Sequence, residues 1–106
     1  MMFLLVRYEL LLPARYNDRR PVEVEKHLAC FKEAMQQFGG ATLEPQQLQG
    51  SWIFEGIEYE DSLVRLVVEV PDTPENHTWF EDWRVVLKER FGQLDIRITW
   101  YPVHVL

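Results

Sequence analysis

Stretches that look like strands and stretches that look like helices follow one another along this chain, and their order limits how it can fold. Some stretches alternate apolar and polar side chains, as half-buried strands do. Others repeat apolar side chains at spacings of three and four, as amphipathic helices do. The predicted elements are, in order, strand 3–12, helix 21–38, strand 51–54, strand 63–70, helix 74–91 and strand 95–100.

This order predicts one compact α+β unit. If both strand–helix–strand connections are right-handed, the strands form a four-stranded antiparallel sheet with both helices on one face. That arrangement is the ferredoxin-like βαββαβ sandwich, and it would place strands 3–12 and 63–70 in the centre of the sheet. A length of 106 residues is typical of one domain with its own core, so we expect a single domain over 1–106.

Proline and glycine residues suggest where the elements begin and end. Pro21 suits the first turn of the first helix, and Gly39 ends it. Thr73 is placed to cap the second helix, and Gly92 to end it. The region between the helices is less clear, because Pro45 indicates a loop or a bulged edge segment over 42–49.

The hairpin that follows is predicted from its glycine and its acidic residues. Gly56 indicates a bulge or bend, and 58–62 is predicted to be the turn between two strands. On the helices, the apolar spacing predicts which side chains face the core. The expected stripes are Val24, Leu28, Phe31, Met35 and Phe38 on the first helix, and Trp79, Phe80, Trp83, Val86, Leu87 and Phe91 on the second, with Trp100 also inward.

Charge and cysteine content argue against several classes of function. The net charge is −6, whereas a nucleic-acid-binding protein usually presents a positive face to phosphates. Cys30 is the sole cysteine, which suits a reducing cytoplasm and is typical of a small buried apolar residue on a helix. No apolar run is long enough for a membrane span. We therefore expect a cytoplasmic protein that binds neither nucleic acid nor membrane.

The sheet face that the two helices leave uncovered is the best functional clue. Charged and aliphatic side chains are mixed on it, and its polar members form a candidate ligand or interface face: Arg7, Glu9, Arg65, Glu69 and Arg97. One interpretation is a solvated face with cross-strand Arg–Glu pairs. Another is a homodimer interface, sheet against sheet. An RNA platform is disfavoured, because the central strands lack outward aromatic residues for base stacking.

Two loops concentrate charge. Arg15, Arg19 and Arg20 precede the first helix, whose free N–H groups also attract anions, so this loop is a candidate anion site. Negative charge gathers in the predicted hairpin at Glu55, Glu58, Glu60 and Asp61. A solvated turn is the plain interpretation, and contact with the arginine loop of another subunit is the alternative.

No residue pattern predicts a metal site or a cofactor. His27, His77 and His104 include no pair at helical spacing, and no second cysteine supplies a thiolate. His27 could pair with Glu23 along the first helix. The apolar C-terminal residues 102–106 are unusual for a chain end and are expected to dock, preferably across a dimer contact.

These observations lead to two hypotheses of different class. The first is a non-enzymatic, homo-oligomeric interaction or binding module that acts as a homodimer and contacts another protein or a small ligand. The alternative is a small cofactor-independent enzyme, an oxygenase or isomerase of the dimeric α/β-barrel type. In that case Arg7, Glu9, Arg65 and Arg97 would line the cavity, and His104 could serve as an acid or base.

Overall fold

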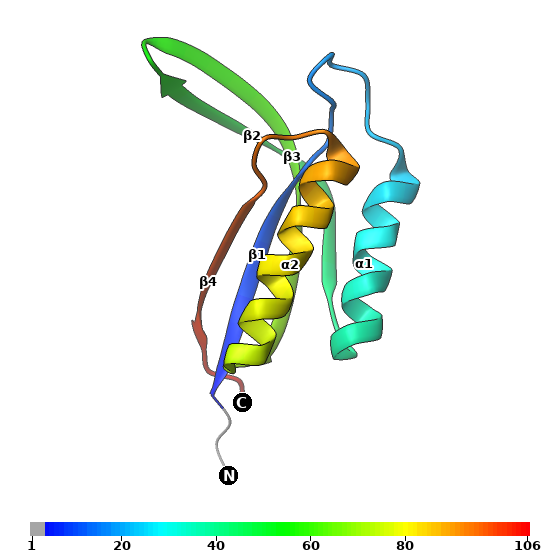
Figure 1. Cartoon of the computed structure of the whole chain (residues 1–106), viewed down its shortest axis with the longest axis vertical. Helices are drawn as coiled ribbons and strands as arrows, with labels where there is room; N and C mark the ends of the chain where they lie inside the picture. Colours follow the sequence, from blue (N-terminus) through cyan, green and yellow to red (C-terminus); the bar gives the residue numbers. More distant parts are fainter. Residues whose placement is uncertain (1–3) are drawn as a thin grey trace.

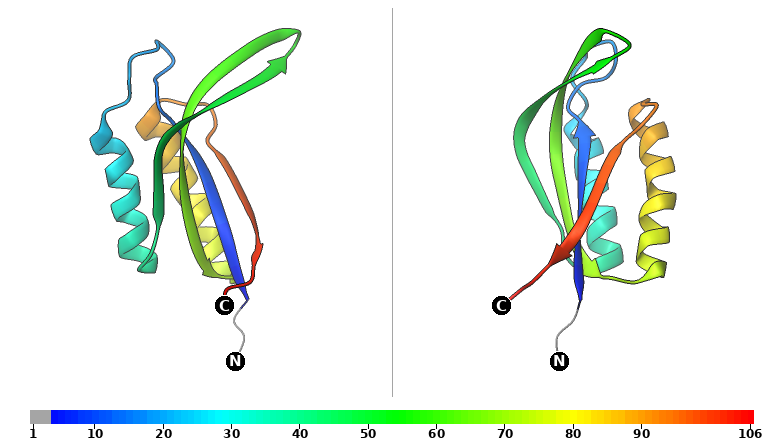
Figure 2. Two further views of the ribbon diagram at one scale, coloured as in Figure 1. Left: turned by 180° about the vertical axis from the view of Figure 1, so that it is seen from behind. Right: turned by 90° about the vertical axis from the view of Figure 1, so that its left-hand side faces the viewer.

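A computed structural model describes residues 4–106 and shows strands and helices in the predicted order. The elements are β1 (Leu5–Pro13), α1 (Val24–Phe38), β2 (Thr42–Phe54), β3 (Ile57–Pro71), α2 (Pro74–Phe91) and β4 (Arg97–Val103). The strands form one antiparallel sheet in the order β2-β3-β1-β4, and both helices lie on the same face of it (Figures 1 and 2). The central place predicted for 3–12 and 63–70 is confirmed by β1 and β3, although residue 3 lies outside the described residues.

The structure corrects the predicted ferredoxin-like sandwich. The β2–β3 hairpin is much longer than predicted and projects as a two-stranded ribbon well past the ends of both helices (Figure 1). The helical layer therefore covers only part of a sheet whose strand order is β2-β3-β1-β4. The chain is therefore an α+β protein with this strand order, and the predicted ferredoxin-like sandwich is wrong.

The projecting part of the hairpin, residues 50–61, is called the β2–β3 arm below. Its strands are joined by Glu55 and Gly56, which both have positive φ angles, of 50° and 78°. Two consecutive residues with positive φ match the twist of a tight antiparallel hairpin. The turn is therefore at 55–56 and not at 58–62, and the acidic residues after it are strand residues. The bulge predicted near Pro45 is confirmed by a shift in pairing register between Glu44 and Leu48.

The core lies between the inner face of the sheet and the two helices. Alternate residues of β1 and β3 are buried, which confirms the period-two pattern of these strands. The aromatic ring of Tyr8 stacks on Phe80 of α2 with centroids 3.8 Å apart. The buried side chains of the second helix are Phe80, Trp83, Leu87 and Phe91, whereas Val86 is exposed, contrary to prediction.

Helix α1 is rotated relative to the prediction. Its buried residues are His27, Cys30 and Ala34, while Val24, Leu28 and Met35 are exposed. Small side chains at 30 and 34 let the helix approach the sheet closely, and the His27 Nε2 atom lies 2.7 Å from the carbonyl oxygen of Pro13. This contact fixes the rotation of the helix and replaces the predicted pairing of His27 with Glu23. Burial of Cys30 agrees with the sequence prediction, and it raises the pKa of the thiol.

The capping predictions hold for α2 and fail at the start of α1. The Thr73 side chain accepts a hydrogen bond from the Asn76 backbone N–H, and Gly92 ends the helix with a φ of 62°. Pro21, in contrast, lies outside α1 and forms a β-bridge with Arg15 that closes the loop before the helix. Among residues 4–106, no helix has the length and apolar character needed to cross a membrane.

A polar cluster joins the two helices. The Arg90 guanidinium donates to both carboxylate oxygens of Glu33, at 3.0 and 2.6 Å, and the Trp83 indole N–H donates to the same carboxylate at 2.8 Å. Burial opposes ionisation of Glu33, but these hydrogen bonds outweigh it, so the pKa of the carboxyl is lowered from 4.5.

We predict that this cluster makes stability depend on pH. Because the folded pKa of Glu33 is lowered, its contribution is fully present above pH 4.5 and is lost as the pH falls through the folded value. The substitution Glu33→Gln should lower the free energy of unfolding by about 1 kcal/mol at pH 7, and by less in acid. Urea denaturation at several pH values measures this. Glu25→Gln is the control, since Glu25 has no ion-pair partner among the described residues, and an equal loss there would contradict the prediction.

The core packing is tested by a matched pair of leucines. Leu10 is fully buried under the helices, whereas Leu94 is 96% exposed. Leu10→Ala should lower the free energy of unfolding by about 2–5 kcal/mol, because it leaves a cavity in the packed layer. Leu94→Ala should change it by less than about 0.5 kcal/mol. Similar losses for both variants in urea denaturation would show that the inner face of β1 is not the core.

Candidate functional site

The face of the sheet that bears no helix, called the open face below, carries a regular array of side chains. The pairing register sets them in rows that run across the strands. One row is Glu69–Arg7–Tyr101, the next is Thr42–Val67–Glu9–Thr99, and the third is Glu44–Arg65–Leu11–Arg97. Most of these side chains are half-buried although no second layer covers them. They bury one another, and that packing brings charged and aliphatic groups into contact.

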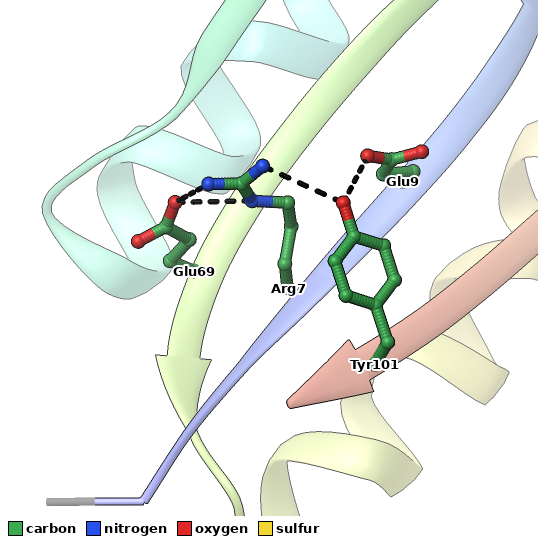
Figure 3. A network of polar contacts seen from close by, with 4 residues as sticks. All are labelled: Arg7, Glu9, Glu69 and Tyr101. Atoms are coloured by element: carbon green, nitrogen blue, oxygen red, sulfur yellow. Dashed lines mark hydrogen bonds and ion pairs between the residues drawn. The ribbon is translucent and has the colours of Figure 1, made fainter. Parts of the chain in front are cut away.

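A hydrogen-bonded network occupies one end of the open face (Figure 3). The Nε and Nη2 atoms of Arg7 donate to the same oxygen of Glu69, at 3.1 and 2.6 Å. Its Nη1 atom donates to the Tyr101 hydroxyl at 3.4 Å, and that hydroxyl donates to the Glu9 carboxylate at 2.6 Å. The hydrogen bond to Glu69, and then the one to Tyr101, raise the pKa of Arg7. The network thus holds one cation between two anions.

Tyr101 is the member that the sequence prediction missed. The predicted strand ended at Trp100, but β4 continues to Val103. The signal was present, because residues 97, 99 and 101 alternate onto the same face of a strand. Extending the strand by one residue would have placed the hydroxyl beside Arg7.

The other predicted arginines of the open face lie apart from this network. Arg65 faces Glu44, with 3.7 Å between guanidinium and carboxylate, and its buried Nε has no hydrogen-bond partner among the described residues. Arg97 is exposed on the far side of Leu11 and makes no ion pair within residues 4–106. Four residues of β1 separate the rows of Arg7 and Arg65, a distance of about 13 Å. The five predicted residues therefore share a face but do not converge on one point.

The β2–β3 arm extends the open face with apolar side chains. Strand alternation and register place four of them on that side of the ribbon: Trp52, Phe54, Ile57 and Tyr59. The rings of Trp52 and Tyr59, which face each other across the strands, stack with centroids 6.1 Å apart. All four side chains are exposed, Phe54 by 61%. The arm therefore presents an apolar surface that its own chain does not cover.

A cleft lies between the arm and the loop at 14–20. It has a volume of about 760 Å³, and Arg15 and Arg19 line it together with the acidic side chains Glu58, Glu60 and Asp61. Burial raises the pKa of Asp61. The two charge clusters predicted from the sequence thus line one cleft of the same chain. Their contact between subunits stays a prediction.

The arginine loop is ordered by its own contacts. Arg15 donates to the carbonyl oxygen of Arg19 at 2.9 Å, and Arg19 has a φ of 71°, which is unusual for a residue with a side chain. Arg20 pairs with Asp18 at 2.6 Å. Glu23, which precedes α1, accepts a hydrogen bond from Tyr16 that lowers its pKa, so an acidic group already occupies the start of this helix. Anion binding by this loop stays a prediction.

Comparison with known proteins adds no functional assignment. No model of a protein family matches the chain, and no curated protein is similar to it at a significant level. Within residues 4–106, no group of three or more histidine, cysteine or acidic residues is placed to hold a metal ion. Any function must therefore be argued from the geometry of the open face, the arm and the pockets.

We expect the stability of the β2–β3 arm to depend on the stacked rings of Trp52 and Tyr59. Trp52→Ala removes the stack with Tyr59, and cross-strand pairs of this kind contribute about 0.2–1 kcal/mol. Amide hydrogen exchange within 50–61 should become several-fold faster, while exchange in β1 stays unchanged. The control is Ile53→Ala, on the opposite side of the same strand. Equal acceleration by both variants would show that the stacked pair is not what orders the arm.

Proposed function

We propose that this protein is a non-enzymatic, homo-oligomeric interaction module, and that its open face is the interface between two copies of the chain. The observation that carries this proposal is a four-stranded sheet face that has no covering layer and on which Arg7 and Arg65 lie beside Glu69 and Glu44. We also propose that it acts in the cytoplasm, where a lone buried cysteine stays reduced.

The charge pattern supports a second copy as the occupant of this face. A two-fold interface brings the same surface of each subunit together, so an unpaired charge near the axis would meet its own copy. Here Arg7 is neutralised by Glu69, and Arg65 lies beside Glu44. The aliphatic side chains between these pairs, Leu11 and Val67, can then be buried against their counterparts without placing like charges in contact.

The size of the surface is also adequate. Four strands at about 4.8 Å spacing and nine residues at about 3.4 Å each give a sheet face of roughly 600 Å². Two further strands in the arm add roughly 200 Å² by the same spacing. A standard interface buries about 800 Å² on each partner. The open face and the arm together therefore meet the requirement of a stable dimer.

The arm gives an independent argument. A two-stranded ribbon is only marginally stable in water when no other layer packs against it. The arm is such a ribbon, it lengthens the molecule to 48 Å, and it exposes a cluster of aromatic side chains. A second subunit packed on the same side would cover these residues. The exposed C-terminal residues Val105 and Leu106 do not dock on their own domain, and we propose that they contact the partner.

The enzymatic alternative receives less support. It requires Arg7, Glu9, Arg65 and Arg97 to line one cavity as free polar groups. Arg7 instead uses all of its guanidinium nitrogens on Glu69 and Tyr101, and Glu9 accepts from the same tyrosine. Groups that already satisfy one another suit a buried interface better than a reaction centre.

The proposal predicts a dimer that a charge on the open face disrupts. Light scattering should give twice the chain mass of 12.7 kDa for the natural protein. Val67→Asp buries a carboxylate without a partner at the interface, so the dissociation constant should rise at least about a hundredfold. Arg65→Ala, which leaves Glu44 unpaired, should weaken the dimer less.

The matched control is Val85→Asp, because Val85 is exposed on α2, away from the open face. This variant should keep the dimer mass. Circular dichroism shows whether each variant is folded. Two results would refute the proposed interface. One is a natural protein that is monomeric both at high concentration and after 100-fold dilution, and the other is a Val67→Asp variant that stays dimeric.

A further inference from the structure

A pocket lies on the opposite side of the sheet from the open face, between α2 and the edge strand β4. Its volume is about 420 Å³, within the range of sites for small molecules. One wall is formed by Phe80, Glu81 and Arg84 of α2, and the other by residues 95–100 at the start of β4. Tyr8 and His77 complete the lining. Arg97 and Thr99, which stand in the rows of the open face, also line the pocket at the edge strand.

Three polar side chains form a chain through the pocket. Tyr8 is only 3% exposed, and its hydroxyl oxygen lies 3.1 Å from Nδ1 of His77. The other ring nitrogen of His77 lies 3.5 Å from a carboxylate oxygen of Glu81. Because each ring nitrogen of an imidazole can donate or accept, His77 can link the tyrosine hydroxyl to the carboxylate.

Aromatic rings surround these polar groups. Tyr8 stacks on Phe80, and the ring of Trp100 meets His77 edge to face with centroids 4.8 Å apart. Trp100 was predicted to be a core residue, but it is 54% exposed. A large indole held partly open beside a pocket offers its ring face to a ligand, and aromatic faces attract cations.

The charges of the pocket are unevenly distributed. At one end, Arg84 pairs with Asp95 and also donates to the carbonyl oxygen of Ile96, so its positive charge is neutralised. At the other end, Glu81 lies beside His77. Arg97 also lines the pocket and makes no ion pair within residues 4–106. The pKa of Tyr8 is raised by burial and also by the negative charges of Asp72 and Glu81, which agrees with a negative potential at the Glu81 end.

We propose that this pocket binds a small organic cation, a primary amine with an apolar body. The ammonium group donates to the Glu81 carboxylate. The apolar body lies against Trp100 and Phe80. Charge-assisted hydrogen bonds at the polar end and an aromatic wall beside it are the two features that such a ligand requires.

Phenethylamine is a suitable probe, and 3-phenylpropionate is its matched anion of similar shape. Isothermal titration should give millimolar or tighter binding of the amine to the full chain. Binding of the anion should be at least about tenfold weaker, because it meets Glu81. In NMR spectra, the amine should shift the resonances of the His77 ring and the Trp100 indole, which locates the site.

Variants separate this site from general charge attraction. Glu81→Gln should weaken amine binding about tenfold, because it removes the negative charge that the ammonium group meets. Asp82→Asn is the control, because Asp82 is a neighbouring exposed carboxylate on α2 that does not line the pocket. Equal effects of Glu81→Gln and Asp82→Asn, equal binding of amine and anion, or no amine binding would overturn the proposal. Since Glu81, Phe80 and Trp100 lie away from the open face, these outcomes do not depend on whether the dimer forms.

Discussion

The packing of Tyr8 against Phe80 is the contact on which the remaining structure depends. It fixes α2 over the centre of the sheet and sets which side of β1 is the inner one. Because side chains alternate along a strand, the neighbours of Tyr8 must then point the other way. Arg7 and Glu9 thus lie on the open face because the residue between them is in the core. The same contact places the tyrosine hydroxyl in the pocket beside α2.

The sequence predicts best where one periodicity dominates. Strands β1 and β3 alternate strictly, and α2 combines a capping threonine with a closely spaced aromatic stripe, so all three were predicted with their inner faces nearly right. Helix α1 was only partly predicted, because Phe31 and Phe38 of its apolar stripe pack against the core while Val24, Leu28 and Met35 are exposed. Small residues at Cys30 and Ala34, together with the contact between His27 and Pro13, decide its rotation, and these depend on the sheet beneath it.

The candidate sites also differ in how well the sequence predicts them. The pairing of Arg7 with Glu69 follows from two central strands that are antiparallel neighbours, so it was within reach of the sequence. The β2–β3 arm was not predicted from the sequence, because a Glu-Gly turn is a weak hairpin signal and the acidic run after it resembles a loop. The pocket beside α2 was also missed, because Trp100 looks like a core residue until the edge position of β4 is known.

The distribution of apolar side chains favours assembly over a monomer. The chain is 47% hydrophobic and 13% aromatic, and the core between sheet and helices is complete without the arm. Evenly scattered apolar residues on a surface need no explanation, but a contiguous patch does. Here the surplus is contiguous, since Trp52, Phe54, Ile57 and Tyr59 share one side of a ribbon that continues the open face. In the proposed dimer, the ion pairs on that face would set the register of the two copies, and the apolar side chains of the arm would supply the buried area that holds them together.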